Sequence, residues 1–385
     1  MLPCIALGLQ INVYERTGGI PSTTLLAAAL QDRISDYSHT LDRHIGFETM
    51  TCSFACTLEE ALDWLANGLG RSCEVSGPDC EIVWEGVLET IEAQIGQERR
   101  SVSLREMANR VRARYQTVLG TQGARPTAST FFEDADSIAR YGKKDLALAI
   151  GNTSDNTEAD NYGAVMLAKL KDPLAAPSST AASGDLGPIR LTLSFAGWYT
   201  TLDWLLASNT STTKTATTTQ LVTLLTAAAA INNFISTSTA NITASGVAVG
   251  EYIDPDTTYR SKIESLMSFG NGTQPYAWGV YENREFYAAP WAGASPGAVD
   301  YQRHLGESDV LDSAGAPVAP WMVRPDAMYQ VIELLDVAPV ATQQDAAGRF
   351  YVARVTCSIG EGLISVQLEP EQSSNLEAVL VTKYL

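Results

Sequence analysis

The chain has 385 residues, of which 45% are hydrophobic, and its 44 acidic and 26 basic residues give a formal net charge of −18. This length exceeds what one hydrophobic core usually serves and indicates several domains. The acidic balance argues against a protein that grips nucleic acid through its phosphates or lies on an anionic membrane, since both need clustered lysine and arginine. The sequence also lacks the run of about 18–20 apolar residues that crosses a bilayer.

The N-terminal stretch MLPCIALGLQINVYERTGG has no basic start and no A-x-A cleavage site, so we interpret it as a strand rather than a signal peptide. Residues 47–56 continue the β pattern. The next stretch, TLEEALDWLANGLG, predicts a helix, because Thr57 can cap its start and Glu60 completes a T-x-x-E capping box.

The stretch EIVWEGVLETIEAQIG, residues 81–96, predicts a half-buried strand rich in acids. These acids are Glu81, Glu85, Glu89 and Glu92. We expect Trp84 to point inward and Gly86 to form a β-bulge, since glycine inside a strand often marks one. The acids would then form an outer row that faces solvent, a lumen or a neighbouring subunit.

Glu85 and Glu89 admit a catalytic interpretation as well as a structural one. A glycosidase needs two carboxylates about 5–10 Å apart across a cleft, and nothing in the sequence indicates that these two line one. The sequence lacks a G-x-S-x-G elbow, an H-E-x-x-H motif and a phosphate-binding glycine loop. We therefore expect no catalytic residue and no cofactor, with Glu85 and Glu89 as wall or interface residues.

The stretch RVRARY alternates strictly and places Arg110, Arg112 and Arg114 on one face of a strand. Such a row could bind phosphate. On a chain this acidic, we expect it instead to face acids, either the glutamates of the neighbouring strand or those of a neighbouring subunit.

Further along the chain, the pattern predicts a helix over residues 155–170 and strand-like periodicity over 189–207. A Thr/Ala-rich segment, 208–248, begins as an exposed loop or cap and continues into a helix, and DTTYRSKIESLMSFGNG predicts another helix. YAWGVYENREFYAAPW predicts a hairpin with its turn near Glu282–Arg284. Three more strands follow, in YQVIELLDV, RFYVARVTCSI and GLISVQLEP.

Several tryptophans are candidate core or anchor positions, some of them at interfaces. They are Trp64, Trp84, Trp198, Trp204 and Trp278. The aromatic cluster from Trp278 to Trp291 could also be a sugar-binding platform, but aromatic residues of this kind more often form the core of a hairpin.

The six cysteines and three histidines do not have the spacing of a metal site. Buried free thiols, made in a cytoplasm, are the simplest interpretation of the cysteines, with a Cys73–Cys80 clasp as the alternative. His39 and His44 lie close together in sequence without a third ligand at a zinc spacing.

Two segments resemble one another: TCSFACTLEEALDWLA from Thr51 and TLSFAGWYTTLDWLLA from Thr192 share T-x-S-F-A and L-D-W-L. Duplication of a β-rich domain would explain the similarity, and chance in short apolar strings is the competing explanation.

A set of strings in fixed order carries a resemblance to a known family. They are G-x-E at Gly46, W-x-G at Trp84, N-R-V-x-x-x-Y at Asn109, S-x-x-x-Y-G at Ser137, G-W at Gly197 and W-G-V-Y at Trp278. In this order the chain resembles the tail hub proteins of tailed bacteriophages, the family related to the baseplate hub of contractile tails. The resemblance extends from about residue 40 to the C-terminus, although none of the strings is specific by itself.

The resemblance implies a mainly β fold with α/β insertions, in which two tube-like β-barrel domains and smaller α/β domains assemble as a ring. The implied domains are a first barrel at 1–120, an α/β connecting domain at 121–185, a second β-rich domain at 186–300 that includes 208–248, and C-terminal strands at 301–385. The segment 208–248 matches nothing in the family pattern and could be an insertion. No appended lysozyme or peptidase domain is evident.

The resemblance also implies a structural virion protein without enzymatic activity. It would form a homo-oligomer, expected to be a trimer, that adapts the tail tube to the tail tip in a tail assembled in the host cytoplasm. Its partners would be the tube or distal tail protein, the tape-measure protein and a spike or tip protein. DNA would pass an acidic lumen without specific binding, and no membrane anchor is expected. Alternatives are a distal tail or a receptor- or carbohydrate-binding tip module, and a cell-wall-degrading enzyme.

Overall fold

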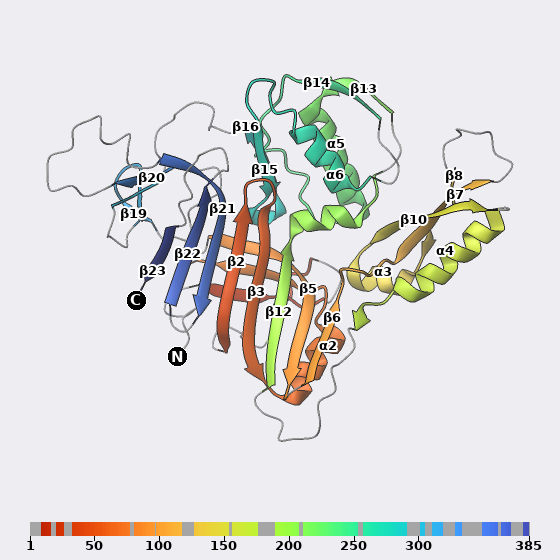
Figure 1. Ribbon diagram of the computed structural model, residues 1–385, viewed down its shortest axis with the longest axis horizontal. Coiled ribbons are helices and arrows are strands. Elements are labelled where there is room, and N and C mark those ends of the chain that lie inside the picture. The colour runs from red at the N-terminus through yellow and green to blue at the C-terminus, as the bar shows by residue number, and fades with distance from the viewer. Residues whose placement is uncertain are drawn as a thin grey trace.

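A computed structural model of the chain describes residues 9–16, 21–26, 33–77, 81–96, 98–117, 127–153, 156–175, 189–207, 211–252, 257–290, 301–304, 310–318, 328–332, 349–360, 363–370 and 380–384. These residues form a large sheet, a small α/β unit and a helical unit (Figure 1). The predicted class, mainly β with helices, is confirmed.

Seventeen of the described strands join the large sheet. They are β1 Gln10–Val13, β2 Ile34–Asp42, β3 Gly46–Cys56, β4 Ser72–Ser76, β5 Ile82–Ile95, β6 Glu98–Ser103, β11 Leu174–Ala175, β12 Ile189–Gly197, β15 Tyr276–Val280, β16 Phe286–Pro290, β17 Tyr301–His304, β18 Val310–Asp312, β19 Pro317–Val318, β20 Met328–Ile332, β21 Arg349–Gly360, β22 Leu363–Pro370 and β23 Leu380–Tyr384.

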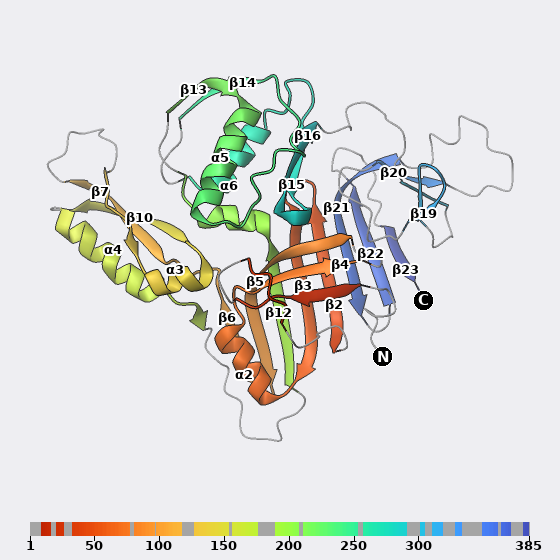
Figure 2. The same ribbon diagram turned by 180° about the vertical axis from the view of Figure 1, so that it is seen from behind.

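The main part of this sheet is an antiparallel series of strands in the order β6–β5–β12–β3–β2–β21–β22–β23. The first half of β5 pairs with β4, and β4 pairs with β1. In Figure 2 these three strands cross in front of β2 and β3, so the sheet folds over on itself. Among the described strands the pairings do not close on themselves, so the chain alone does not show the predicted tube-like barrels.

The small α/β unit contains β7 Arg110–Thr117, β8 Thr127–Ala128, β9 Phe132–Glu133, β10 Asp145–Thr153, α3 Ala135–Tyr141 and α4 Asn156–Leu170. Strand β10 pairs with β7 in parallel, while β8 and β9 pair with β7 in the antiparallel sense. Helix α4 covers the face of this sheet that carries Ala113 and Tyr115, which pack with Ala159. Strand β7 belongs to this unit although its residues fall within 1–120.

The helical unit contains the 3-10 helix η1 Trp198–Trp204, β13 Ser211–Ala216, α5 Thr217–Ile231, β14 Ala248–Tyr252 and α6 Tyr259–Met267. The start of the Thr/Ala-rich segment is therefore strand β13 and the buried first turn of α5, not the exposed loop that we predicted, and its predicted helix is α5. The strand-like pattern that we predicted over 189–207 is correct only as far as Gly197, where β12 ends and η1 begins. The hairpin β15–β16, with η2 Glu282–Arg284 at its turn, is confirmed.

Helix α2, Leu58–Asn67, begins as its sequence predicts. The hydroxyl of Thr57 accepts a hydrogen bond from the backbone N–H of Glu60 at 3.2 Å. The Glu60 carboxylate binds Arg33 at 2.6 Å, and this ion pair ties the first turn of α2 to the sheet.

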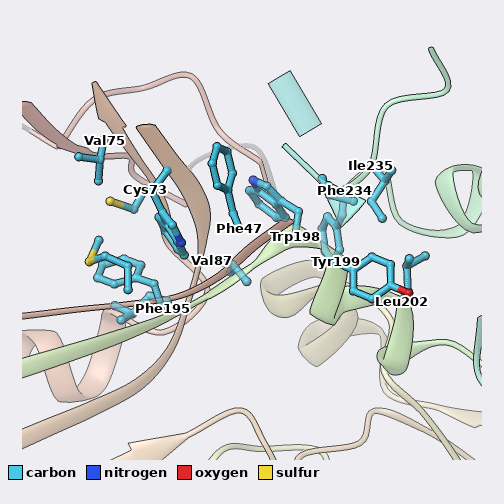
Figure 3. Close-up of a cluster of buried hydrophobic side chains, with 14 of the residues drawn as sticks. Phe47, Cys73, Val75, Val87, Phe195, Trp198, Tyr199, Leu202, Phe234 and Ile235 are labelled. Carbon is cyan, nitrogen blue, oxygen red and sulfur yellow. The ribbon is translucent and has the colours of Figure 1, made fainter. Parts of the chain in front are cut away.

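A continuous hydrophobic core joins the folded sheet to the helical unit. Figure 3 shows it running from Cys73, Val75, Val87 and Phe195 past Phe47 and Trp198 to Tyr199, Leu202, Phe234 and Ile235. The two parts therefore share one core. Among the described residues, the structure contains no helix that is both long and apolar enough to span a membrane.

Candidate functional site

The glutamates of β5 do not form the outer row that the sequence predicts. Glu85 is only 7% exposed and lies opposite Glu74 on β4. One of its carboxylate oxygens accepts a hydrogen bond from the backbone N–H of Arg284, in the hairpin turn. Burial, reinforced by the charges of Glu74 and Glu282, raises the pKa of Glu85 from 4.5 to about 8, although the contact with Arg284 acts in the opposite direction.

Glu89 lies at the position where the pairing of β5 with β12 changes register. Ser194 pairs with Thr90 and Phe195 pairs with Leu88, so Glu89 is the extra residue of the bulge. Strand β5 therefore has bulges at Glu89 and, in its pairing with β4, at Val83, and it has none at Gly86, where we predicted one. The Glu89 carboxylate is buried and binds Arg105 at 2.9 Å, which compensates its charge within the chain.

Gly86 instead allows strands β5 and β12 to approach one another closely. A Cβ on Gly86 would lie 2.2 Å from the carbonyl oxygen of Ala196 on β12 and 2.4 Å from the Trp84 ring. The ring needs this space because Trp84 is completely buried and packs edge-on against Phe195.

Three more glycines, Gly46, Gly197 and Gly279, lie where two strands approach one another closely in the same region. We call these close contacts, with that of Gly86, the glycine crossings. A Cβ on Gly197 would lie 1.7 Å from the carbonyl oxygen of Phe47, and a Cβ on Gly279 would lie 2.3 Å from the backbone nitrogen of Gly46. Gly46 itself has φ +80 and contacts the backbone of Val280. Only a residue without a side chain fits such contacts, so β3, β12 and β15 are locked together through their backbones.

All five candidate tryptophans are buried. Their exposed fractions are 3% for Trp64, 0% for Trp84, 2% for Trp198, 5% for Trp204 and 8% for Trp278. The ring of Trp278 stacks on His44 with a centroid distance of 4.1 Å, and its Nε1 donates to the hydroxyl of Tyr199 at 3.3 Å. Trp278 is thus part of the hairpin core and does not offer an open face to a sugar.

The arginine row lies on β7, in a different sheet from β5, so the acids beside it are not the β5 glutamates but acids of β9 and β10, the strands that pair with β7. The chain leaves the large sheet after β6 and turns into the α/β unit before Arg110. There Arg110 binds Glu133 at 2.7 Å and Asp145 at 3.0 Å. Arg110 and Arg112 also lie over the ring of Phe131, at 4.2 and 4.8 Å.

One acid of β5, Glu92, finds its partner on β6, which the sequence-based prediction overlooked. Arg99 binds Glu92 across the β5–β6 hairpin, and Arg100 binds Glu98 at 3.1 Å along β6. The sequence signal was available, because ERRSVS follows the Gly96 turn with basic residues at cross-strand spacing.

The α/β unit joins the rest of the molecule at residues 142–145, through two buried asparagines. The side chain of Asn109 accepts from the backbone N–H of Lys144 at 2.8 Å and donates to the carbonyl of Gly142 at 2.7 Å. From the helical unit, the Asn232 amide accepts from the N–H of Lys143 and donates to its carbonyl, both at 2.8 Å. The two amides hold this segment from both sides.

Lys144 places a charged side chain inside this junction. It is 5% exposed, its ammonium group lies 4.4 Å from the centre of the Trp204 ring, and it donates to the carbonyl of Leu104. Burial lowers the pKa of Lys144 from 10.5 to about 8, with Glu89 acting in the opposite direction. The amine thus ties the α/β unit to η1 and to the end of β6.

Asp145 and Gly142 complete the junction. An Asp145 oxygen accepts from the backbone N–H of Leu206 at 3.0 Å, and burial raises its pKa. Gly142, with φ +76, allows its backbone to lie against Phe234, where a Cβ would be 2.4 Å from the ring. Polar and apolar contacts therefore converge on one short segment.

One histidine, His39, and three free thiols, those of Cys52, Cys73 and Cys357, are core residues of the large sheet. His39 is 1% exposed, its Nδ1 lies 2.8 Å from the hydroxyl of Tyr37, and burial lowers its pKa from 6.5 to about 3. Cys73 is a buried free thiol, while Cys80 lies outside the described residues. Within the described part of the chain, no three or more His, Cys, Asp or Glu side chains gather as metal ligands would.

The two similar segments at Thr51 and Thr192 are neighbours in one sheet. Strands β3 and β12 pair antiparallel, with Leu193 opposite Cys52. Each strand leads into a short helix that ends near a buried tryptophan, Trp64 or Trp204. The arrangement gives one continuous sheet instead of two separate copies of a domain, and it leaves duplication open.

No protein-family model and no curated protein matches this sequence. Among solved structures, the tail protein from Neisseria meningitidis MC58 is similar with a TM-score of 0.42 and 11% identity, over 92% of this chain and 93% of that chain. The 43 kDa tail protein of prophage MuSo2 from Shewanella oneidensis has a TM-score of 0.40 and 7% identity, over 94% of this chain and 97% of that chain. Similarity at this level carries no inference about function.

Proposed function

We propose that the protein is a structural component of a bacteriophage tail, namely a hub whose subunits form a ring between the tail tube and the tail tip. The observation that carries the proposal is the position of the six hub-like strings in the fold. They are distant in sequence, yet each lies at one of the tight contacts that join the strands or the units.

Four of the strings meet at the glycine crossings of the large sheet. The W-x-G string ends at Gly86, against β12, and the G-W string begins at Gly197, against Phe47. The G-x-E and W-G-V-Y strings meet where Val280 pairs with Gly46. The resemblance is therefore concentrated where the architecture tolerates the fewest residue types.

The other two strings meet at the junction of the α/β unit. Asn109 of the N-R-V string donates to the carbonyl of Gly142, the last residue of the S-x-x-x-Y-G string. The same two strings contribute Arg110, which binds Asp145, and Tyr141, whose ring lies under Arg16 at 5.2 Å. A subunit locked in this way presents its parts in fixed relative positions, as a ring component needs.

In the proposed assembly the subunits form a homotrimer, and tube-like barrels are completed within the ring. The ring contacts a tube or distal tail protein on one side and a spike or tip protein on the other, with the tape-measure protein in its lumen. A net charge of −18 suits a conduit through which DNA passes without binding. The protein is then a non-enzymatic part of the virion tail, assembled in the host cytoplasm.

One observation favours a second candidate, a cell-wall-degrading enzyme. Glu85 keeps its proton up to about pH 8, which is a property of general acids. Its burial and its bond to the hairpin turn favour a structural role for this carboxyl. Zymography on peptidoglycan distinguishes the two, because clearing by the wild type that both Glu85→Gln and Glu89→Gln lose would establish the enzyme.

Immunogold labelling of intact virions tests the proposed tail role. Antibodies against this chain should label the end of the tail, at the boundary between tube and tip. Virions without label, or label confined to the capsid, would contradict the proposal. Particles whose gene for this chain is disrupted should lack assembled tails.

A further inference from the structure

Strand β10 is an edge strand whose first half, before the irregularity in its pairing with β7 between Ala149 and Asn152, lacks the usual protection of an edge. Among the described strands, β7 is its only partner. Exposed edges normally carry lysine, proline or an inward charge that discourages pairing with another chain. The sequence of β10 from Leu146 to Ile150 is LALAI, which has no charge and no proline.

The pairing with β7 defines which backbone groups of β10 are available. The N–H of Arg110 donates to the carbonyl of Lys144 at 3.0 Å, and Asp145 is opposite Arg110 in the parallel register. In a parallel ladder, alternate residues turn both backbone groups to the same neighbour. Lys144, Leu146 and Leu148 therefore face β7, whereas the N–H and C=O groups of Ala147 and Ala149 point to the outer edge.

The side chains beside this edge leave room for another strand. Ala147 and Ala149 are on the face of the arginine row, where they are opposite Arg112 and Arg114. Leu146 and Leu148 are on the face that α4 covers. Ala149 is exposed and the other three are half-buried, so an incoming strand meets small or apolar groups at four successive positions.

A second open edge lies on the other side of the molecule. Strand β23 ends the large sheet, and within the described residues β22 is its only partner. In Figure 1 β23 is at the left and the α/β unit is at the right. A contact between two different edges of identical subunits is head-to-tail, and repetition of such a contact closes a ring when the rotation permits.

The geometry points to β10 as an intersubunit edge that pairs with β23 of a second copy of this chain. The pairing rests on the ring of the proposed function and deepens it by naming the two strands that meet. The N–H and C=O groups of Ala147 and Ala149 supply the hydrogen bonds from one side. Repeated around the ring, the pairing joins the large sheet of each subunit to the α/β sheet of the next.

Photo-crosslinking identifies the strand that reaches this edge. Full-length protein with p-benzoylphenylalanine in place of Ala149 is irradiated as the assembled oligomer, and the product is digested and sequenced by mass spectrometry. We expect an intersubunit crosslink to a peptide that contains Leu380–Tyr384. The same probe in place of Ala164, which is exposed on α4, should not yield this peptide.

Proline substitution tests the outer backbone groups directly. Ala147→Pro removes one outward N–H without touching the ladder to β7, and proline is tolerated on edge strands. We expect the concentration for half-dissociation of the oligomer to rise by at least about tenfold. Ala147→Ser, which keeps the N–H, should assemble like the wild type.

The outcomes separate this inference from the proposed function. An oligomer that survives Ala147→Pro, or a crosslink from Ala149 to any peptide other than 380–384, overturns the β10–β23 pairing and leaves the ring intact. A wild-type chain that stays monomeric overturns the ring itself and the pairing with it. Should Ala147→Pro fail to fold, the crosslinked peptide decides alone.

Discussion

Burial determines the ionisation of two side chains in the large sheet, and it does so in opposite senses. Glu85 keeps its proton to about pH 8, and His39 stays neutral down to about pH 3. Both are therefore uncharged in the folded protein near neutral pH. Two uncharged side chains suit the interior of the large sheet, because a charged group would have to be buried away from water there.

The raised pKa of Glu85 predicts a loss of stability as the pH rises. Below pH 4.5 the carboxyl is protonated in both states, and between 4.5 and about 8 only the folded state keeps the proton. Folding then becomes weaker by up to about 1.4 kcal/mol per pH unit over this window. Glu85→Gln cannot ionise, so its stability relative to the wild type should increase from about pH 5 to about pH 8.

Denaturant unfolding of both proteins at the two pH values measures this effect. Glu59→Gln is the matched control, because Glu59 is exposed on α2. A stability difference between Glu85→Gln and the wild type that does not change with pH would show that the Glu85 carboxyl is not protonated in the folded state.

The lowered pKa of His39 predicts the reverse dependence. Below pH 6.5 the unfolded chain binds a proton at this imidazole, whereas the folded chain does not until about pH 3. Stability should therefore fall as the pH falls below 6.5, by up to about 1.4 kcal/mol per unit. His39→Gln should remove this part of the acid sensitivity, as followed by thermal unfolding between about pH 7 and pH 5. His44→Gln, at a half-buried histidine, should retain it, and equal slopes in all three proteins would contradict the assignment.

At the scale of elements, the glycine crossings should be the least tolerant positions of the sheet. Gly279→Ala would place a Cβ 2.3 Å from the backbone nitrogen of Gly46, and relieving such a contact costs about 1–3 kcal/mol or more. Gly246→Ala is the control, since nothing lies within 4 Å of its Cβ position. Urea unfolding of the two variants should separate them clearly, and a similar midpoint for both would show that the crossing can relax.

The Asn109 amide should be essential to the attachment of the α/β unit. Asn109→Ala leaves the N–H of Lys144 and the carbonyl of Gly142 without their partner, and each buried unpaired group costs about 1–3 kcal/mol. Limited proteolysis should then cut faster between residues 104 and 145. Asn67→Ala, at an exposed asparagine of α2, should leave the cleavage rate unchanged. Equal protection in both variants would contradict a junction that depends on Asn109.

Some elements were predictable from short sequence patterns and others were not. The T-x-x-E box at Thr57 and the turn at Glu282–Arg284 were predictable, because each depends on residues that are close in sequence. The end of β12 at Gly197 was not, since η1 is stabilised by distant contacts such as that of Trp198 with Phe234. Similarly, Gly86 indicated a local bulge, and only the crossing with Ala196 shows its actual role.

The partners of charged side chains were harder to predict than the secondary structure. Alternation correctly placed Arg110, Arg112 and Arg114 on one face, but their partners depend on which sheet β7 joins. That choice follows from the turn at 104–109 and from Lys144, whose burial no periodicity reveals. The junction at 142–145 was therefore absent from the sequence-based candidates, although its GKKD string is polar within an apolar context.

At the scale of the whole molecule, one core serves the large sheet and the helical unit, and a polar junction holds the α/β unit in place. The subunit is therefore expected to enter the assembly as a preformed body. Its apolar β10 edge and its terminal β23 edge are the surfaces that we assign to contacts between copies.

Native mass spectrometry of the purified chain, combined with negative-stain images, is the decisive test of the proposed ring. We expect a closed ring, a trimer with three times the 41.3 kDa mass of the chain, and three-fold or pseudo-six-fold symmetry in the images. A stable monomer at all micromolar concentrations, with no rings in the images, would contradict it.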